Sequence, residues 1–428
     1  MQLVAYGAQD IYLTGNPQIT FFKVVYRRHT NFAMEAIEQT FNGVANFGSK
    51  VVCTIARNGD LVGRMIIEID MSEPINNDAN DALAEIRGLG HKLIKSAEVE
   101  IGGQKIDKHY GEWLDLWNQL CETSENKLKL KQMINGCLKN EDGSNKLYIP
   151  LQFWFNRNPG LALPLISLQY HEVKIVIEFN KQSDIKWWKI TNTDPEVKTL
   201  KTLPSTTKLN NVCLFSDYIF LDTDERRRFA QVSHEYLIEQ LQTTGTCSFK
   251  ARVEKVNIPL NFNHPCKELV WVVQDSARKG TFDYTVKGTG NSHVGVEDDE
   301  EYVCDTVLQL NGHDRFRRRE GSYFRLVQPY QHHGSAPDQG VDVNNVVCRP
   351  ENGYMYAYSF ALKPCEHQPS GTCNFSRIDN AVLNMSLRDV SSVTLGTTAH
   401  GDKDVRVYTT NYNVLRIMSG MGGLAYSN

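Results

Sequence analysis

The sequence contains 428 residues, of which 41% are hydrophobic and 22% are charged, and its formal net charge is −4. This length predicts two domains, each large enough to bury a core, and the composition is ordinary for a folded protein. The net charge argues against a large nucleic-acid surface, because phosphate binding usually shows as an excess of basic residues. We therefore expect no specific nucleic-acid partner.

Neither a signal peptide nor a membrane-spanning helix is expected. The opening residues Met1 to Tyr6 contain no basic region followed by a long apolar one. The longest apolar runs are short and contain helix breakers, as in Leu161 to Ile166.

The ten cysteines do not form the pattern of a disulfide scaffold or of a structural zinc site. None falls in a Cys-x-x-Cys pair, and the two closest, Cys365 and Cys373, flank a Pro-Ser-Gly turn. We therefore expect free thiols in a reducing compartment.

Residues 1–31 are expected to form an N-terminal arm. Asn16-Pro17 marks a turn, and the stretch Ile19 to Tyr26 fits a short helix and a strand equally well. Four aromatic residues lie between Tyr12 and Tyr26, and an exposed aromatic arm would lower solubility. We expect the arm to dock on a neighbouring domain or subunit rather than to remain solvated.

The first half, residues 32–221, is dominated by predicted strands. Two hairpins are expected, each made of two strand-like runs around a glycine turn: Val51 to Ile55 with Leu61 to Ile69 through Asn58-Gly59, and Lys95 to Ile101 with Gln104 to His109 through Gly102-Gly103. Further strands are predicted at Tyr148 to Phe155, His171 to Phe179 and Asp217 to Leu221.

Two helical stretches interrupt these strands. Ala82 to Lys95 can form a short amphipathic helix, and Trp113 to Leu138 is the most helical part of the chain. The second stretch carries apolar residues that are available to cover a sheet, namely Trp113, Leu116, Trp117, Leu120, Leu128, Leu130 and Met133.

A charged joint follows the first half. Six of the seven residues from Asp222 to Arg228 are charged, and they separate two apolar runs. Few buried contacts are expected across such a joint, so we place a linker at residues 222–230 and a second domain at residues 231–428.

The second half repeats the strand-rich pattern with fewer helices. Its loops are polar, and one ends in the acidic run Glu297 to Glu301, which we interpret as a solvated surface rather than a calcium site because it lacks EF-hand spacing. The predicted strands are Tyr236 to Gln242, Cys247 to Asn261, Glu268 to Gln274, Val303 to Leu310, Met355 to Leu362, Ala381 to Leu387, Val405 to Thr410 and Val414 to Met418.

Several landmarks of the first half recur in the same order in the second, about 200 residues later. Ala36 to Gln39 is echoed by Leu237 to Gln240, and Val99 to Gln104 is echoed by Leu308 to His313. Two copies of this length are domain-sized. Many strands with turn residues between them and few helices indicate β-sandwiches or barrels rather than a parallel α/β sheet.

Long segments of the chain resemble the major capsid proteins of large nucleocytoplasmic DNA viruses, especially those of algal viruses and their giant relatives. The segments that carry this resemblance are GAQDIYLTGNPQITFFKVVYRRHTNF from Gly7, EIGGQKIDKHYGEW from Glu100, NPGLALPLISLQYHEVK from Asn158, DYIFLDTDERRRFAQVSHEYLIEQLQ from Asp217, KPCEHQPSGTCNFSRIDNA from Lys363 and NYNVLRIMSGMGGLAYSN from Asn411. The chain departs from the family mainly in loops, at Asn180 to Leu209, Asp275 to Tyr302 and Gln331 to Asn352.

The resemblance implies an all-β fold of two tandem eight-stranded antiparallel jelly-roll β-sandwiches with short helices in the loops. It also implies a homotrimer that forms a pseudo-hexagonal capsomer of an icosahedral shell. Its expected partners are neighbouring capsomers, minor capsid proteins and, as a further candidate, an internal viral membrane. The expected location is the virion, after assembly in the host cytoplasm.

The residues themselves indicate no catalytic, cofactor-binding or metal-binding site. Gly420 to Gly423 lacks the full spacing of a nucleotide-binding loop and has no room for a following helix, so we expect a flexible or packed tail. His332-His333 and His171-Glu172 do not cluster at metal-ligand spacing. Two rival readings of a jelly roll, a carbohydrate-binding protein and a metal-dependent cupin enzyme, would require an aromatic platform or such a metal cluster.

Two basic clusters and two sequons complete the candidates. Arg226 to Arg228 and Arg315 to Arg319 are expected either to pair with local acids or to dock on an acidic neighbour or an anionic lipid headgroup. Asn374 and Asn384 match the N-glycosylation sequon. Asn384 lies in a predicted strand, which leaves Asn374 as the candidate, although a chain without a signal peptide would not normally meet the secretory glycosylation machinery.

Overall fold

The computed structural model describes residues 31–72, 88–135, 138–139, 145–191, 194–286, 301–334, 339–341, 347–350, 354–390, 394–395, 398–399 and 401–426. The predicted arm up to residue 30 and the acidic run up to residue 300 lie outside the described residues.

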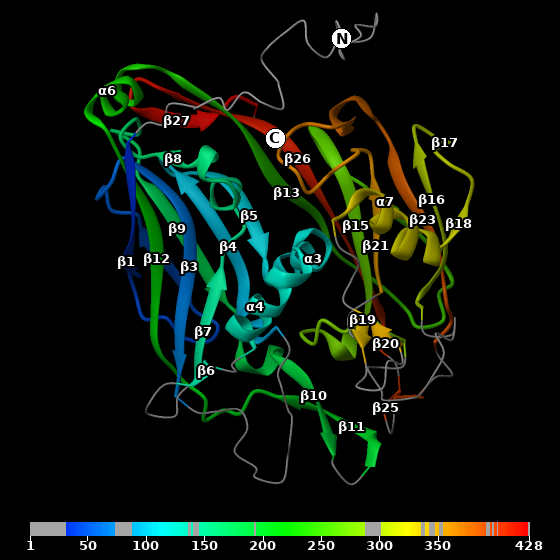
Figure 1. Ribbon diagram of the computed structural model, residues 1–428. Coiled ribbons are helices and arrows are strands. Elements are labelled where there is room, and N and C mark those ends of the chain that lie inside the picture. Colours follow the sequence, from blue (N-terminus) through cyan, green and yellow to red (C-terminus); the bar gives the residue numbers. More distant parts are fainter. Residues whose placement is uncertain are drawn as a thin grey trace, which may run out of the picture.

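The first half folds into two antiparallel sheets that face each other across a core (Figure 1). One sheet has the strand order β1-β12-β3-β7-β6, with β8 added to β3, and the other has the order β2-β9-β4-β5. Their bounds are β1 Phe32–Thr40, β2 Lys50–Thr54, β3 Leu61–Met71, β4 Ile94–Ile101, β5 Gln104–Tyr110, β6 Leu138–Lys139, β7 Asn145–Pro150, β8 Leu163–Pro164, β9 Val173–Phe179 and β12 Leu209–Leu221.

The second half repeats this arrangement. Its sheets have the orders β13-β26-β15-β21, with β22 and β27 added at β15 and β26, and β14-β23-β16-β17, with β18 added at β16. Their bounds are β13 His234–Phe249, β14 Lys255–Pro259, β15 Pro265–Asp275, β16 Val303–Leu310, β17 His313–Asp314, β18 Arg319–Glu320, β21 Met355–Ser359, β22 Cys373–Asn374, β23 Ala381–Leu387, β26 Lys403–Met418 and β27 Met421–Leu424.

Strand for strand, the two halves have one topology. The four-strand paths β1-β12-β3-β7 and β2-β9-β4-β5 recur as β13-β26-β15-β21 and β14-β23-β16-β17. Eight strands in two four-stranded antiparallel sheets form a jelly roll, and the chain contains two in tandem. The duplication that the sequence predicts is therefore a duplication of fold.

One predicted hairpin is wrong. The strands at Lys50–Thr54 and Leu61–Met71 exist, but β2 pairs with β9 whereas β3 pairs with β12 and β7. In a jelly roll these successive strands cross to opposite sheets, and Asn58-Gly59 lies in that crossing. The other predicted hairpin, β4 with β5 through Gly102-Gly103, is confirmed.

The predicted helical stretch after β5 is confirmed as two helices, α3 Gly111–Cys121 and α4 Ser124–Ile134. The earlier stretch forms only the short helix α2 Leu89–Leu93 within the described residues. The remaining short elements are α5 Trp154–Arg157, α7 Gln328–His332, the π-helix η5 Tyr323–Val327, the 3-10 turns η1 Pro159–Leu161, η2 Gln182–Asp184, η3 Ser276–Arg278 and η6 Phe375–Arg377, and the hairpins β10 Lys186–Thr191 with β11 Asp194–Thr202, β19 Gln339–Val341 with β20 Val347–Pro350, and β24 Thr394–Leu395 with β25 Thr398–Ala399.

The charged joint is itself a helix, α6 Thr223–Gln231, whose N-terminus is capped by the Asp222 carboxylate at 2.7 Å from the Thr223 amide. The Arg226 side chain forms an ion pair with Asp60 of the first jelly roll, with Nε 2.9 Å from Oδ1. Asp60 also accepts a hydrogen bond from the Leu221 amide at 2.8 Å. Arg226 thus pairs with an acid from outside its own charged run.

The two long strands of the second half extend over the first core. The predicted strands Val405 to Thr410 and Val414 to Met418 form one continuous strand, β26, which pairs with β13 along its length. Ile238, Leu415 and Ile417 from these strands are buried in the apolar cluster of the first jelly roll. The glycine-rich tail turns back as β27 on β26, so it is packed in a hairpin.

Candidate functional site: the seam between the two jelly rolls

Helix α3 belongs to the first jelly roll but has two buried faces. Leu114 points into the first core. Trp113, Leu116 and Leu120, spaced at i, i+3 and i+7, lie on another face and are at most 1% exposed. The sequence predicts that these residues cover a sheet, and the sheet they cover belongs to the other jelly roll.

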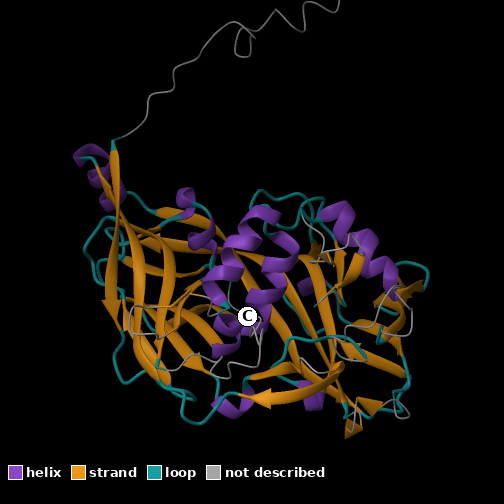
Figure 2. Ribbon diagram, turned by 60° about the horizontal axis from the view of Figure 1, so that its bottom comes forward, coloured by secondary structure: helices purple, strands orange, loops and turns teal. Residues whose placement is uncertain are grey.

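The surface that receives α3 is the outer face of the sheet β13-β26-β15-β21. Tyr408, Val270 and Ala357 lie side by side on adjacent strands of this sheet and join the α3 side chains in one buried apolar cluster. The Trp113 and Tyr408 rings are 5.6 Å apart. Figure 2 shows helices gathered between the two sets of strands. We call this contact region the seam.

A buried ion pair crosses the seam beside this apolar cluster. Glu112 at the start of α3 forms a two-point ion pair with Arg406 of β26, at 2.6 Å to Nε and 2.7 Å to Nη2. The hydroxyls of Tyr408 and Tyr284 donate to the same carboxylate at 2.5 and 3.1 Å. Burial disfavours the charge on Arg406, but the Glu112 carboxylate outweighs it and raises the pKa of Arg406.

A second charged cluster crosses the seam at Glu239, which is 4% exposed. Arg157 from the first jelly roll lies 2.7 Å from one carboxylate oxygen, and Lys267 lies 2.9 Å from the other. The His367 ring contacts that second oxygen at 3.2 Å. Burial alone would raise the pKa of Glu239, but His367, Arg157 and Lys267 together lower it to about 2. The Arg157 guanidinium also lies 4.9 Å from the centre of the Trp117 ring of α3.

A disulfide bond closes the seam covalently and corrects the expectation of free thiols. Cys121, at the end of α3, is bonded to Cys365 of the second half, 244 residues further along the chain. The sequence gives no sign of this pair, because only the packing of α3 on the second jelly roll brings the two thiols together. Six other cysteines within the described residues are free.

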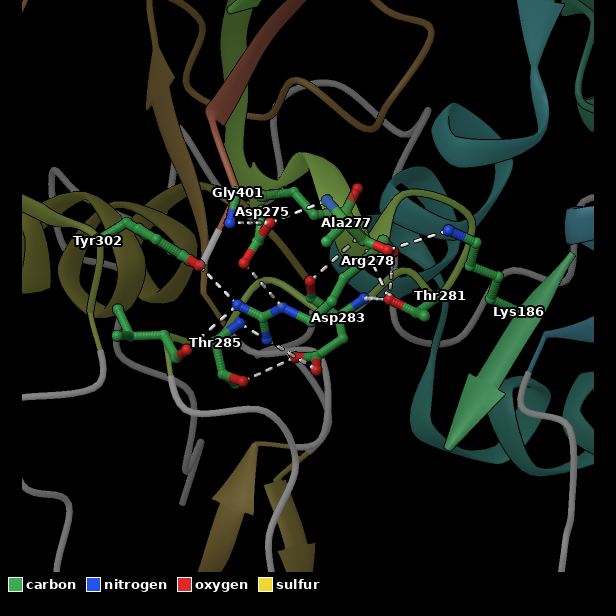
Figure 3. A network of polar contacts seen from close by, with 11 residues as sticks. Lys186, Asp275, Ala277, Arg278, Thr281, Asp283, Thr285, Tyr302 and Gly401 are labelled. Carbon is green, nitrogen blue, oxygen red and sulfur yellow. Dashed lines mark hydrogen bonds and ion pairs between the residues drawn. The ribbon is translucent and has the colours of Figure 1, made fainter. Parts of the chain in front are cut away.

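A third polar cluster surrounds Arg278, in the loop after β15 (Figure 3). Its side chain is 2% exposed and contacts Asp283 at 3.2 Å and the Tyr302 hydroxyl at 2.5 Å. Burial opposes the charge, but Asp283 outweighs it and raises the pKa of Arg278. Lys186, from β10 of the first half, donates to the Ala277 carbonyl at 3.0 Å. This cluster thus orders a loop of the second jelly roll against the first.

Sequence reasoning did not identify the polar residues of the seam. Glu112, Glu239 and Arg406 are single charged residues within an otherwise ordinary helix or strand. A usable signal was the apolar spacing on α3, which has more apolar positions than packing against one core requires.

The seam has a recess of about 250 Å³ lined by Trp154, Arg157, Asn158, Pro159, Leu161, Glu239, Cys365 and His367.

The two adjacent histidines chosen from the sequence contact different partners. His333 is buried against Glu268 at 2.8 Å, whereas His332 contacts the Leu362 carbonyl. In the Arg315–Arg319 cluster, Arg318 pairs with Asp305, and Arg319 lies over the Tyr323 ring.

The side chain of Asn374 is partly exposed and accepts a hydrogen bond from the Ser376 amide at 3.0 Å. Across the described ranges, no three His, Cys, Asp or Glu side chains are placed to hold a metal ion. None of the helices that the structure describes is both long and apolar enough to cross a membrane.

Two family descriptions together match nearly the whole chain. "Major capsid protein N-terminus" matches residues 20–222, and "Large eukaryotic DNA virus major capsid protein" matches residues 225–423. The chain belongs to the major capsid protein family of large eukaryotic DNA viruses. Members of this family are structural proteins of the viral capsid, and this capsid protein is likewise structural and not an enzyme.

Individual capsid proteins are similar over the full length of the chain. The major capsid protein of Pyramimonas orientalis virus is 51% identical and that of Paramecium bursaria Chlorella virus 1 is 43% identical, each over 100% of this chain and 99% of the relative. A chain of the PBCV-1 virus capsid has a TM-score of 0.77 and 37% identity, covering 96% of this chain and 100% of that one. The Faustovirus major capsid protein, at 13% identity and a TM-score of 0.68 over 96% of this chain and 94% of that one, shows the shared fold. The resemblance noted in the sequence and the double jelly-roll fold are confirmed.

Removing the seam disulfide should destabilise the folded chain without unfolding it. For Cys121→Ser/Cys365→Ser we expect the free energy of unfolding to fall by up to about 4 kcal/mol, because the unfolded chain is no longer closed into a long loop. Urea unfolding measures this loss. Wild-type protein with a reducing agent should behave like the double variant, and Cys304→Ser, at an exposed free cysteine, should match wild type. Equal stability of oxidised and reduced wild type would contradict the expectation.

The Glu239 cluster should make stability depend on acid pH. Its pKa is about 2 in the folded chain, below the ordinary value of 4.5. The stability it contributes is therefore complete above pH 4.5 and is lost as the pH falls toward 2. Between pH 5 and 3, wild type should lose on the order of 2 kcal/mol more unfolding free energy than Glu239→Gln.

Chemical denaturation at several pH values measures this difference. Glu235→Gln, at an exposed carboxylate paired with Arg416, serves as the control and should follow wild type. Parallel pH profiles for wild type and Glu239→Gln would contradict the assignment.

Proposed function

We propose that three copies of this chain form a trimeric, pseudo-hexagonal capsomer of an icosahedral shell. The observation that carries the proposal is that one chain holds two jelly rolls of identical strand order, fixed to each other by the buried seam. Three such chains around one axis present six similar bodies, and such an object can tile a hexagonal lattice with only threefold symmetry.

The seam supports this proposal because a capsomer subunit must keep its shape within the shell. An apolar cluster, a two-point ion pair and a disulfide all join the halves. Interfaces between domains that move relative to each other are usually small and polar. We propose accordingly that residues 32–221 and 231–428 are the two jelly-roll domains of the capsomer subunit and that residues 222–230 are the linker between them.

Further contacts of the capsomer remain part of the proposal. Residues 1–31 contribute to contacts between domains or subunits, and neighbouring capsomers, minor capsid proteins and an internal viral membrane are the partners. Assembly takes place in the host cytoplasm. Asn374, on a partly exposed turn, is the candidate for glycosylation.

The test is the mass and outline of the purified protein. Light scattering after size exclusion should give three times the 48.7 kDa mass of one chain, and negative-stain images should show hexagonal outlines with threefold symmetry. Metal analysis in the same experiment addresses the cupin alternative. A monomer that binds sugar, or a monomer or dimer with stoichiometric metal, would overturn the proposal.

A further inference from the structure

The helical segment 323–332, made of η5 and α7, occupies the same place in the second jelly roll as α3 does in the first. Helix α3 lies between β5 and β7. Segment 323–332 lies between the β17–β18 region and β21, the strands that correspond to β5 and β7 in sheet order. Both segments therefore connect the same two strands of the duplicated fold.

Two glycines, each lying close to a backbone carbonyl group, show which residues of the two segments correspond. Gly111 begins α3, and a Cβ atom there would lie 2.2 Å from the carbonyl oxygen of Ile94, the first residue of β4. Gly321 precedes η5, and a Cβ atom there would lie 2.3 Å from the carbonyl oxygen of Val303, the first residue of β16. Only glycine fits such an approach at either place, so Gly111 and Gly321 are equivalent positions.

Counting from these glycines aligns the inward-facing residues. Leu114, three residues after Gly111, is buried in the core of the first jelly roll. Phe324, three residues after Gly321, is buried in the core of the second. Each segment is thus anchored in its own jelly roll at the same position.

The same count aligns two of the three seam residues with exposed ones, whereas Trp113 aligns with Tyr323, which is half-buried against the second core. Leu116 and Leu120 are 0% and 1% exposed because the second jelly roll covers them. Their equivalents, Leu326 and Tyr330, are 44% and 87% exposed. Val327 beside them is 38% exposed. An apolar face that is covered in one copy of the fold is therefore open in the other.

The sheet face that corresponds to the one beneath α3 is only partly covered by the residues that the structure describes in the first jelly roll. Strand pairing places Phe215 and Ile66 side by side on β12 and β3, with Tyr148 on the same outer face of β7. These side chains are partly exposed, and none of the apolar clusters formed by the described residues includes them. The first jelly roll thus has a partly exposed acceptor face, and the second has an exposed helical segment.

The charges of the two open faces are complementary. Next to the helical segment, the residues from Arg315 to Arg319 are exposed except for Phe316, and Arg318 and Arg319 help to line a groove of about 390 Å³ with Leu326 and Val327. Arg318 is partly neutralised by Asp305. The four arginines of the cluster still outnumber the nearby acids Asp305, Asp314 and Glu320, the last of which also lines the groove.

The acceptor face gathers carboxylates around Cys213 of β12. Burial raises the pKa of the Cys213 thiol to about 12, with further contributions from Glu38, Glu68 and Asp70. Lys146 pairs with Glu68 at 2.5 Å and offsets one of these charges. With Lys146 and the exposed Arg64 of β3 counted against Glu38, Glu68 and Asp70, the rim of this apolar face keeps a small excess of negative charge, which favours an apolar segment next to arginines.

We propose that segment 323–332 of one chain packs on the outer face of the β1-β12-β3-β7 sheet of a second copy, repeating between chains the seam found within the chain. This inference rests on the proposed trimer and names its contact. The contact joins two different surfaces head to tail. Three such contacts alternate with three internal seams, and six jelly rolls close into a ring.

Two variants break opposite sides of this contact. Leu326→Asp/Tyr330→Asp alters the helical segment and leaves the acceptor face intact, whereas Glu38→Arg/Ile66→Arg places positive charge on the acceptor face and leaves the segment intact. We expect each variant alone to be monomeric in sedimentation velocity. A 1:1 mixture should form dimers and nothing larger, because it contains one usable contact for each pair of chains.

Controls separate this inference from the trimer proposal. Val44→Asp, at a position 85% exposed, matches Tyr330 in exposure and should leave the trimer intact, and unchanged thermal unfolding should show that all variants fold. If both double variants still form trimers, the named contact is wrong while the trimer stands. Monomeric variants that fail to form dimers on mixing would also overturn the named contact, whereas monomeric wild type would overturn both proposals.

Discussion

The burial of helix α3 between two cores is the constraint on which the rest of the structure depends. One face of the helix completes the first jelly roll through Leu114, and another is covered by the second through Trp113, Leu116 and Leu120. A helix that is apolar on more than one face cannot be left at a surface without a large loss of buried area. The two jelly rolls are therefore held as one body rather than as two domains on a tether.

The polar groups of the seam give this apolar contact a defined register. A buried ion pair is weak evidence for net stability, because desolvation costs about as much as the attraction returns. Its geometry is nevertheless demanding: Glu112 must meet Arg406, and Glu239 must meet both Arg157 and Lys267. Sliding one jelly roll over the other would leave these charges buried and unpaired. The disulfide between Cys121 and Cys365 adds a covalent limit to the same motion.

Because the fold is duplicated, the surfaces that form the seam occur twice in each chain. Each jelly roll has a helical connection between equivalent strands and an equivalent outer sheet face, and the second jelly roll's face receives α3. Within one chain only one connection and one face can meet, so the other connection and face remain open. The exposure of Leu326 and Tyr330 is expected for a connection that has no partner face within its own chain. In the proposed trimer, the seam within one chain is the pattern for the contact between chains.

The sequence by itself determined the all-β class, the duplication and the family, because these depend on local alternation, turn residues and the order of long segments. It also located the strand Ala381–Leu387 at its observed bounds and the helical stretch from Trp113 to Leu138, although not its division into α3 and α4. Only the tertiary structure decided that the strands at Lys50–Thr54 and Leu61–Met71 belong to opposite sheets, since a short polar connection fits a hairpin and a crossing equally well. The same holds for the bond between Cys121 and Cys365 and for the pairing of Glu112 with Arg406, because contacts between residues hundreds of positions apart depend on how two completed folds pack together.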